Sequence, residues 1–439
     1  MRQAVRGASW AAVYLLVSLL PLVIALTPSR PPGRGFWLDL SVALGFVGLS
    51  MLGLQFALTA RFQGVAGPYG MDIVLRFHRQ ISMVAFGFIL AHPVIVLVTQ
   101  PGLRWIFNPL VAPGRTLLGM ASLALLIAIM VTSVWRLRLR IGYEAWRVTH
   151  GILAVAVVGT ALAHVAAVGY YVSLPWKRVL WVLLSVSLIG LLVWVRLVKP
   201  LLQYRRPWRV AEVRPERGDV TTLVLEPDGH DGVSFLGGQF AWLIIRNSPF
   251  HVVENPFSFS NSAEDRGGRV EFTIKELGDF TRTVPHIPVG TRAYLDGPYG
   301  MFTTERNEAP GFVFFAGGIG ITPIASILKT LADRRDQRPM LLFYGTTEPG
   351  EAALLEELDR LRDRLDLRVV QVPQEPPEGW TGESGFIDAE MIGRHLGDDP
   401  SRRTFFICGP DPMMDAIEEA LEQLGVAMDR VVTERFNLI

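Results

Sequence analysis

Four histidines in the first half of the chain form two pairs with the same spacing. The segment "HRQISMVAFGFILAH" places His78 and His92 14 residues apart, and "HGILAVAVVGTALAH" places His150 and His164 at the same separation. Ionisable residues within apolar membrane segments are costly and are often functional. Hydrogen-bonded core histidines are the alternative, but two matched pairs favour a shared role. Neutral imidazole is a good iron ligand, whereas zinc would need Cys, Asp or Glu ligands that do not accompany these pairs.

Helical geometry places the two histidines of each pair on nearly one face. A rise of about 1.5 Å per residue separates them by about 21 Å, and 14 steps of about 100° fall about 40° short of four full turns. If the two helices run in the same direction, His78 lies level with His150, and His92 lies level with His164. Two facing pairs at two depths suit two bis-histidine haems.

The elements that position these histidines are apolar. Of the 439 residues, 50% are hydrophobic, and the mean hydropathy is +0.32, with the apolar residues concentrated before residue 200. A helix needs about 20 residues to cross a bilayer. The stretches that reach this length are 9–27, 36–60, 74–100, 116–135, 145–172 and 178–198. We expect residues 1–203 to form an all-α transmembrane domain of six helices that carries the histidines.

The distribution of Lys and Arg predicts how these helices are oriented. If the N-terminus is cytoplasmic, the inner ends hold twelve such residues: Arg2, Arg6, Arg61, Arg76, Arg79, Arg136, Arg138, Arg140, Arg147, Lys199, Arg205 and Arg206. The outer ends then hold six: Arg30, Arg34, Arg104, Arg115, Lys177 and Arg178. Positive residues are enriched on the cytoplasmic side. We therefore expect a multi-pass protein of the cell (inner) membrane with a cytoplasmic N-terminus and, after six spans, a cytoplasmic second half.

The second half has an ordinary polar composition and two successive patterns. Short runs such as "TTLVLEP", "QFAWLIIR" and "RVEFTIKEL" predict a small antiparallel β-barrel over residues 204–305. From about Gly311, strand and helix patterns alternate, which predicts an α/β doubly wound domain over residues 306–439. The formal net charge of +1 does not indicate a nucleic-acid partner. The single cysteine, Cys408, excludes an intrachain disulfide and a cysteine metal cluster.

A glycine turn follows the first strand of the α/β region. In "GGIGITP", the residues Gly317, Gly318 and Gly320 would let the backbone approach a phosphate, with the next helix presenting its N-terminal amides. A glycine turn without a ligand is the alternative. The segment "CGPDPMM" repeats this strand-turn-helix pattern, and it places Cys408 at the carboxyl end of a strand, where we assign it no nucleophilic role.

Together these motifs resemble the ferric reductase and NADPH oxidase superfamily over nearly the whole chain. That resemblance implies six membrane helices in which His78 and His150 bind an inner b-type haem and His92 and His164 an outer one. It also implies a cytosolic module of the ferredoxin reductase type, with an FAD-binding barrel and an NAD(P)-binding domain. The positions that match its FAD motifs are Asn255, Pro256, Phe257, Ser258, Lys275, Gly278, Thr281 and Phe436. The positions that match its NAD(P) motifs are Gly317, Gly318, Gly320, Ile321, Thr322, Pro323, Cys408, Gly409 and Pro410.

The activity implied by the resemblance is transmembrane electron transfer by an NAD(P)H-dependent oxidoreductase. Electrons would pass from NADH or NADPH through FAD and two haems to an acceptor on the outer face. That acceptor would be oxygen, giving superoxide or hydrogen peroxide, or a ferric chelate. Oxidase relatives often carry a further histidine where Val96 stands, so both acceptors stay open. The alternatives are a subunit that delivers electrons to a periplasmic protein or quinone, and a sensor, which predicts damaged nucleotide motifs. A homo-oligomer is possible.

The choice of nicotinamide nucleotide depends on the segment after the second strand of the α/β region. This segment, "YGTTEPGE", offers no Arg or Lys to grip a 2′-phosphate, and Glu348 would repel one. We therefore expect use of NADH, or of both nucleotides.

Overall fold

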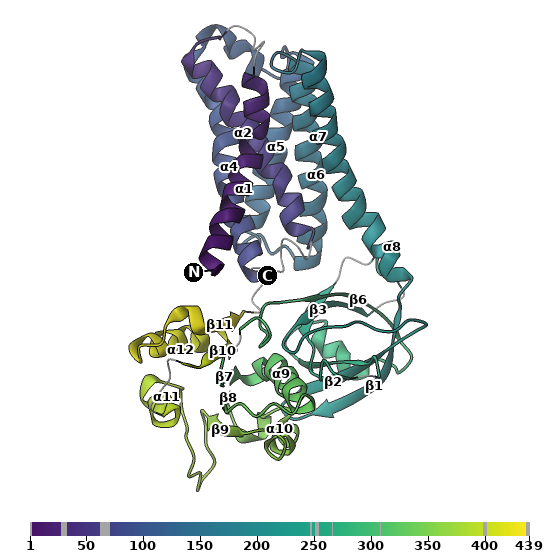
Figure 1. The fold of residues 1–439 in the computed structure, drawn as a ribbon. Coiled ribbons are helices and arrows are strands. Elements are labelled where there is room, and N and C mark those ends of the chain that lie inside the picture. Colours follow the sequence, from purple (N-terminus) through teal and green to yellow (C-terminus); the bar gives the residue numbers. More distant parts are fainter. Residues whose placement is uncertain are drawn as a thin grey trace. The chain divides into compact units, whose positions relative to one another are not determined.

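The computed structural model describes residues 2–27, 33–61, 71–245, 248–250, 254–265, 267–307, 309–397 and 402–435. The chain divides into two compact units, which are drawn as a ribbon in Figure 1. The helical unit comprises residues 1–62 and 74–198, and the sheet unit comprises residues 63–73 and 199–439. The change of unit at residue 199 lies close to the point where the apolar half of the sequence ends.

The helical unit is built from long apolar helices. They are α1 (Arg2–Leu26), α2 (Phe36–Thr59), α4 (Met71–Thr99), α5 (Gly114–Val134), α6 (Tyr143–Val168) and α7 (Pro175–Val193), with a short 3-10 helix η1 (Pro101–Phe107) after α4. Within the described residues, six helices are long and apolar enough to cross a membrane, as the sequence predicted. They expose large apolar side chains such as Leu16, Val98 and Ile152, each more than half accessible. Helices that are apolar on all sides are expected where lipid replaces water.

Small and hydroxylated residues let these helices approach one another closely. A Cβ added to Gly48 of α2 would lie 2.7 Å from Cγ1 of Ile89 on α4, so the glycine is needed for that contact. On α5, the Ser122 hydroxyl donates to the carbonyl of Val157 on α6 at 2.9 Å. Membrane helices commonly associate through small residues and interhelical hydrogen bonds of this kind.

The last membrane helix, α7, is followed directly by two short helical segments of different geometry. A π-helical turn, η2 (Trp194–Val198), leads into α8 (Lys199–Tyr204). The side chains of α8 contact the sheet unit: Lys199 Nζ lies 2.7 Å from Asp296 Oδ2, and the ring of Tyr204 stacks on Tyr294 with centres 6.3 Å apart. The short helix α8 is therefore part of the sheet unit.

The first half of the sheet unit is a curled antiparallel sheet. Its strands are β1 (Trp208–Glu216), β2 (Val220–Pro227), β3 (Phe240–Ile245), β4 (Asn255–Ser258), β5 (Val270–Lys275) and β6 (Arg292–Tyr299), in the order β4-β3-β6-β1-β2-β5. A bridge between Phe259 and Phe272 connects the two ends of this order. The core inside includes Leu223, Phe259 and Phe272, none of which is accessible. The sheet therefore curls around a buried apolar core, as expected of the predicted barrel.

The second half is a parallel sheet with helices on both faces. Its strands are β7 (Phe312–Gly317), β8 (Met340–Thr346), β9 (Leu367–Pro373), β10 (Thr404–Cys408) and β11 (Val431–Glu434), in the order β11-β10-β7-β8-β9. Its helices are α9 (Ile321–Asp333), α10 (Leu355–Arg362), α11 (Ala389–Leu396) and α12 (Asp411–Gln423). Phe312 and Phe314 of β7 pack with α9 and α10, whereas Val313 and Phe315 pack with α11 and α12. This is the doubly wound arrangement that the sequence predicted.

Candidate functional site

One histidine pair faces across two helices of the helical unit. The rings of His78 on α4 and His150 on α6 have centres 6.4 Å apart, with planes inclined by 69°. An imidazole nitrogen binds a first-row metal at about 2.0–2.1 Å, so two axial imidazoles on one metal place their ring centres roughly 6 Å apart. The separation in the structure therefore fits two imidazoles that share a single iron.

All four histidines form their hydrogen bonds through the same ring nitrogen, Nδ1. The Nδ1 contacts are His78 to Gln55 Oε1 at 2.8 Å, His92 to Ser41 O at 3.0 Å and to Ser41 Oγ at 2.8 Å, His150 to Ser133 Oγ at 3.2 Å, and His164 to Arg115 O at 2.6 Å. None of the hydrogen bonds among the described residues uses Nε2 of these four. A metal-binding histidine characteristically donates its other N–H to an oxygen acceptor, which fixes the tautomer and the ring orientation. The arrangement therefore leaves four Nε2 atoms available as ligands.

The second pair is supported by glycines on neighbouring helices. A Cβ added to Gly45 of α2 would lie 3.4 Å from Cγ of His92, and one added to Gly119 of α5 would lie 3.0 Å from Nδ1 of His164. Each glycine therefore provides the room in which a histidine ring lies against the neighbouring helix.

These pairs do not form a site for a bare metal ion. No group of three or more His, Cys, Asp or Glu side chains within the described ranges could hold one. A ligand set of two imidazoles at each level suits a metal whose other ligands come from a macrocycle, as in haem. The residues present therefore fit two haems.

Sequence reasoning missed the partners of the histidines. Ser41, Gln55, Arg115 and Ser133 lie on helices α2 and α5, and only the packing of the helices brings them to the rings. One of them carries a sequence signal: Gln55 is an amide in an otherwise apolar span and is 7% exposed. Its Nε2 donates to the carbonyl of Met51 at 2.9 Å, which holds Oε1 toward His78.

In the sheet unit, the predicted flavin motif lies on strand β4. The side chain of Ser258 is buried, and the half-buried ring of Phe257 stacks on Phe280, with centres 6.1 Å apart. The Nδ2 of Asn255 is buried and has no hydrogen-bond partner among the described residues. Buried amide donors are nearly always paired. This orphaned donor fits a flavin carbonyl, so the chemistry of the motif agrees with FAD. Pro256, on the same strand, pairs with Trp242 of β3.

The second predicted flavin segment makes contacts of its own. The Thr281 hydroxyl accepts from the backbone N–H of Leu277 and of Gly278, each at 2.8 Å. The Lys275 ammonium lies 3.6 Å from Glu351 Oε2. A Cβ added to Gly278 would meet nothing within 4 Å, so the space beside this turn is open. Contact of these three residues with a pyrophosphate stays a prediction, and Phe436 lies outside the described residues.

The two predicted nucleotide motifs lie side by side at the carboxyl edge of the parallel sheet. Cys408 pairs with Ala316, so the turn after β10 lies beside the turn after β7. A Cβ on Gly320 would lie 2.1 Å from the Cys408 carbonyl, and one on Gly317 would lie 2.8 Å from Cδ of Pro410. A Cβ added to Gly409 would lie 3.1 Å from Cα of Gly317. These glycines let the two turns pack against each other.

Gly318 is different, because it opens onto free space. Its φ is +51°, and a Cβ there would meet nothing within 4 Å. It opens the short 3-10 helix η4 (Gly318–Gly320) that leads into α9. In open α/β sheets, ligands bind at this edge, with phosphates beside the first turn of the helix. Among the glycines of this turn, Gly318 is therefore the one with open space beside it, and its contact with a nucleotide stays a prediction.

The remaining predicted nucleotide residues point into the protein. The side chains of Ile321, Thr322, Pro323 and Cys408 are buried. The Thr322 hydroxyl donates to the Ile319 carbonyl at 2.8 Å. Burial raises the pKa of the Cys408 thiol well above its usual range, so it stays protonated. This agrees with the absence of a nucleophilic role, and any contact of these residues with a nucleotide would come through the backbone.

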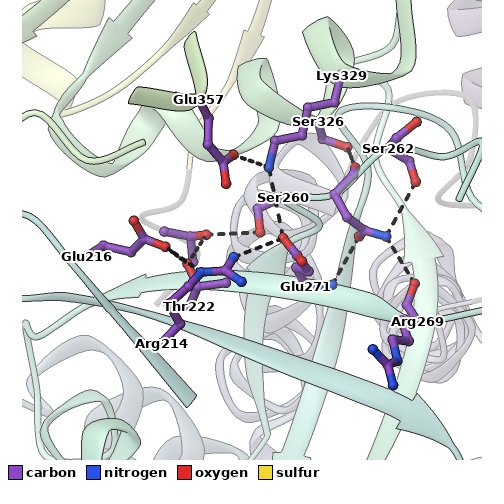
Figure 2. Close-up of polar contacts among 12 residues, drawn as sticks. Arg214, Glu216, Thr222, Ser260, Ser262, Arg269, Glu271, Ser326, Lys329 and Glu357 are labelled. Carbon is purple, nitrogen blue, oxygen red and sulfur yellow. Dashed lines mark hydrogen bonds and ion pairs between the residues drawn. The ribbon is translucent and has the colours of Figure 1, made fainter. Parts of the chain in front are cut away.

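A polar network joins the nucleotide half of the sheet unit to the curled sheet (Figure 2). The Ser326 hydroxyl of α9 donates to the Asn261 carbonyl at 2.8 Å, and the Thr330 hydroxyl accepts from the Ala263 amide at 2.9 Å. Lys329, between them, forms ion pairs with Glu357 and, at 3.9 Å, with Glu271 of β5. Helix α9, which begins at the glycine turn, is therefore fastened to the sheet that carries the flavin motif.

Glu271 is the carboxylate of this network that pairs with two cations, Lys329 and Arg214. Burial raises the pKa of the Glu271 carboxyl, and the cations of Lys329 and of Arg214, which lies 3.5 Å away, oppose that rise only in part. A carboxyl whose pKa is raised by folding stabilises the fold while it is protonated. That contribution is lost as the pH rises from the pKa of an unfolded Glu through the higher folded value.

We predict that Glu271→Gln changes the pH dependence of stability. The variant carboxamide cannot ionise, so its free energy of unfolding, relative to that of wild type, should increase as the pH rises from about 4 towards neutrality. Thermal unfolding of the full chain in detergent, followed by flavin fluorescence at a series of pH values, measures this difference. Glu264→Gln, at an exposed carboxylate paired with Arg334, is the control. A pH-independent difference for Glu271→Gln contradicts the prediction.

Comparison with known proteins identifies two family matches. Residues 44–161 match the family described as ferric reductase like transmembrane component, and residues 314–419 match the oxidoreductase NAD-binding domain. The first match includes His78, His92 and His150 and ends three residues before His164, within α6. The second spans the parallel sheet from β7 to α12, including both nucleotide turns.

Curated relatives match about half of the chain or somewhat less. The chain is 30% identical to the reductase component of propane 2-monooxygenase from Rhodococcus jostii, over 52% of this chain and 63% of the relative. It is 31% identical to NADH-cytochrome b5 reductase 1 from Neosartorya fischeri, over 43% of this chain and 64% of the relative. The chain thus spans just under two thirds of these relatives. A solved ferredoxin reductase of carbazole 1,9a-dioxygenase aligns with a TM-score of 0.47 and 28% identity, over 53% of this chain and 69% of that chain.

Proposed function

Because the chain belongs to the ferric reductase and NADPH oxidase superfamily, we propose that it is an NAD(P)H-dependent oxidoreductase that moves electrons across a membrane. The electrons pass from NADH or NADPH through FAD in the sheet unit and two haems in the helical unit. The final acceptor lies on the outer face and is either oxygen or ferric iron. The proposed domains are the haem domain (1–203), the FAD domain (204–305) and the NAD(P) domain (306–439).

The observation that carries this proposal is the common orientation of the four histidines. Each bonds through Nδ1 to an oxygen on another helix, and donation from Nδ1 to that oxygen leaves the lone pair of Nε2 for a ligand. The rings of His78 and His150 also have a separation that fits one shared iron. Core histidines that serve only packing need not all present the same nitrogen. His78 and His150 would hold the inner haem, and His92 and His164 the outer one.

The other proposed groups follow from the contacts in the sheet unit. FAD, when bound, accepts a hydride and passes electrons on singly to haem iron, which carries one at a time. Asn255 would donate its free amide to the flavin, and Phe257 would cover one side of it. Gly318 would admit the nucleotide phosphates to the first turn of α9. The contacts of Lys329, Glu271 and Ser326 would hold the flavin site and the nucleotide site at a fixed distance from each other.

The excess of Lys and Arg on one side supports an orientation with the N-terminus and the sheet unit in the cytoplasm of the cell (inner) membrane. In this orientation His92 and His164 lie towards the outer face. Two axial histidines leave no open position on the iron, so the acceptor would receive electrons without binding the metal. Oxygen would give superoxide, and a ferric chelate would need only to approach the outer haem.

A comparison of acceptors tests this part of the proposal. The purified chain is given NADH under anaerobic conditions with ferric citrate, and Fe(II) is followed with a chromogenic chelator. In a second experiment it is given NADH and oxygen, and superoxide is followed with cytochrome c and superoxide dismutase. Since NADH carries two electrons, two Fe(II) or two superoxide per NADH identifies the acceptor. NADH consumed in oxygen without superoxide indicates hydrogen peroxide, which is measured with peroxidase. Haems that NADH reduces but that neither oxygen nor ferric citrate reoxidises contradict both acceptors and favour a partner protein or quinone.

We predict that Glu348→Arg shifts the nucleotide preference towards NADPH. Glu348 is exposed in the loop after β8, where doubly wound folds distinguish the ribose 2′-hydroxyl from the 2′-phosphate. Arg can pair with the phosphate, whereas Glu repels it. The ratio of kcat/KM for NADPH to that for NADH should rise at least about tenfold, the equivalent of roughly 1.4 kcal/mol. Glu378→Arg, an exposed charge change in another loop, is the control, and an unchanged ratio in Glu348→Arg contradicts the assignment.

A further inference from the structure

The Nδ1 contact of His150 is the one of the four that includes no amide or backbone oxygen among the described residues. His78 and His164 bond to Gln55 Oε1 at 2.8 Å and to the Arg115 carbonyl at 2.6 Å. His92 contacts both the Ser41 carbonyl at 3.0 Å and the Ser41 hydroxyl at 2.8 Å, and that hydroxyl is held by donating to the His92 carbonyl. His150 bonds to the hydroxyl of Ser133 at 3.2 Å. A serine hydroxyl can rotate, and in a helix it often turns back to a carbonyl of its own preceding turn. The His150 contact therefore needs a further group to hold the hydroxyl in place.

Trp146 is in the position to hold it. It lies one helical turn before His150 on α6, and its indole Nε1 donates to Ser133 Oγ at 3.2 Å. Its ring also packs on the His150 ring, with centres 5.1 Å apart and planes inclined by 44°. An indole N–H can only donate, so this bond keeps Ser133 Oγ beside both rings. The tryptophan thus contacts the His150 imidazole directly and through the serine.

Trp146 is itself fixed by residues at the end of the helices. The Arg136 guanidinium lies 5.5 Å from the Trp146 ring centre and 5.4 Å from that of Tyr143. The rings of Tyr143 and Trp146 have centres 5.7 Å apart. A cation over an aromatic face stabilises such a stack. Arg136 and Tyr143 therefore connect the turn after α5 to the indole that holds His150.

The second histidine pair, His92 and His164, has a different environment from that of His150. Within the part of the chain that the structure describes, the ring contacts that involve these four histidines connect only His78, His150 and Trp146. His92 and His164 lie instead against Gly45 and Gly119, and each bonds to a backbone carbonyl, with His92 also in contact with the Ser41 hydroxyl. A backbone carbonyl therefore helps to orient both of these rings, whereas the described contacts of the His150 ring nitrogen and ring face come from side chains.

We propose that Trp146 is a positioning residue for His150, which sets the plane of its imidazole and maintains its bond to Ser133. The inference rests on the proposed function, in which His150 is a ligand of the inner haem. Groups that orient a ligating histidine tune the metal that it binds. Loss of Trp146 should therefore change the EPR signal and the midpoint potential of the inner haem but not those of the outer haem. The outer haem thus serves as an internal control in the same protein.

The test compares Trp146→Leu, Trp146→Phe and Ser133→Ala with wild type in the purified full chain. The readouts are the EPR signals of the two ferric haems, which report the angle between the axial rings, and a redox titration of both haems. Trp146→Leu should shift one EPR signal and one midpoint potential. Trp146→Phe keeps the ring but loses the N–H, so it and Ser133→Ala should give smaller, similar shifts that do not add in the double variant. Trp181→Leu, which removes a tryptophan of α7 that packs on Phe46, should shift neither haem.

The outcomes separate this inference from the proposed function. A wild-type protein without two low-spin haem signals refutes the proposed function. Two such signals that remain unchanged in Trp146→Leu, or in Trp146→Phe and Ser133→Ala if the leucine variant does not fold, overturn the role of Trp146. A shift in both haems together also overturns it, because it indicates a general loss of helix packing.

Discussion

His164→Leu is expected to remove one of two haems and leave the other in place. Leucine fills much of the volume of the imidazole beside Gly119 but offers no nitrogen to iron, so His92 loses its facing ligand. The haem content measured by pyridine haemochrome should fall from two per chain to one. The remaining EPR signal should be that of the inner haem, which the Trp146 variants shift.

Two further variants make this result specific. His286→Leu, at an exposed histidine of the 3-10 helix η3 (Thr281–His286), should keep both haems. His164→Gly should lose the outer haem and regain it when imidazole is added, because a free ligand can occupy the space of the missing ring. If His164→Leu retains both haems with unchanged spectra, the assignment of His92 and His164 as a ligand pair is wrong.

Gly318→Val is expected to abolish reduction by NADH or NADPH while the cofactors remain reducible by dithionite. The Cβ of the new side chain meets no protein atom within 4 Å, so the valine extends into the space that the proposed nucleotide would use. The φ of +51° adds strain of about 1–2 kcal/mol for a residue other than glycine. The rate of flavin reduction at subsaturating NADH should fall by at least about a hundredfold, since a methyl group of the valine would replace a phosphate contact.

The matched control for this variant is Gly425→Val. Gly425 has a φ of +75° and open space around its Cβ, but it follows α12, away from the glycine turn. It therefore introduces the same backbone strain without affecting the nucleotide. Equal loss of NADH reduction in both variants would show that strain alone is responsible, and would remove Gly318 from the nucleotide site.

The sequence was sufficient to predict the parts of this protein that depend on periodicity. Apolar length predicted the six spans, alternating residues predicted the curled sheet, and the spacing of 14 predicted that His78 and His150 lie level, as their rings do. Each of these depends on the geometry of a single element. The rotation of one helix about its axis relative to another is set by many small contacts, so Gln55 and Ser133 could not be assigned to particular histidines.

Side-chain contacts between elements that are far apart in the chain also could not be predicted from the sequence. Lys275, expected at a pyrophosphate, lies beside Glu351, which is 76 positions later in the chain and belongs to the nucleotide half. Lys329 and Glu271 are joined only because α9 packs on β5. Trp146 did carry a local signal, since it precedes His150 by four residues on one helix face. The domain boundaries and the FAD and NAD(P) contacts stay predictions.

Anaerobic mixing of the purified chain with NADH, followed through the flavin and haem absorbance bands, tests the central claim most directly. The flavin band is predicted to bleach first, and the absorbance change of both haems should then equal the change that dithionite gives. In His164→Leu, which keeps one haem, the haem absorbance change should be half of that in wild type. A flavin that is reduced while both haems stay oxidised, although dithionite reduces them, would contradict the proposed path from nucleotide to haem.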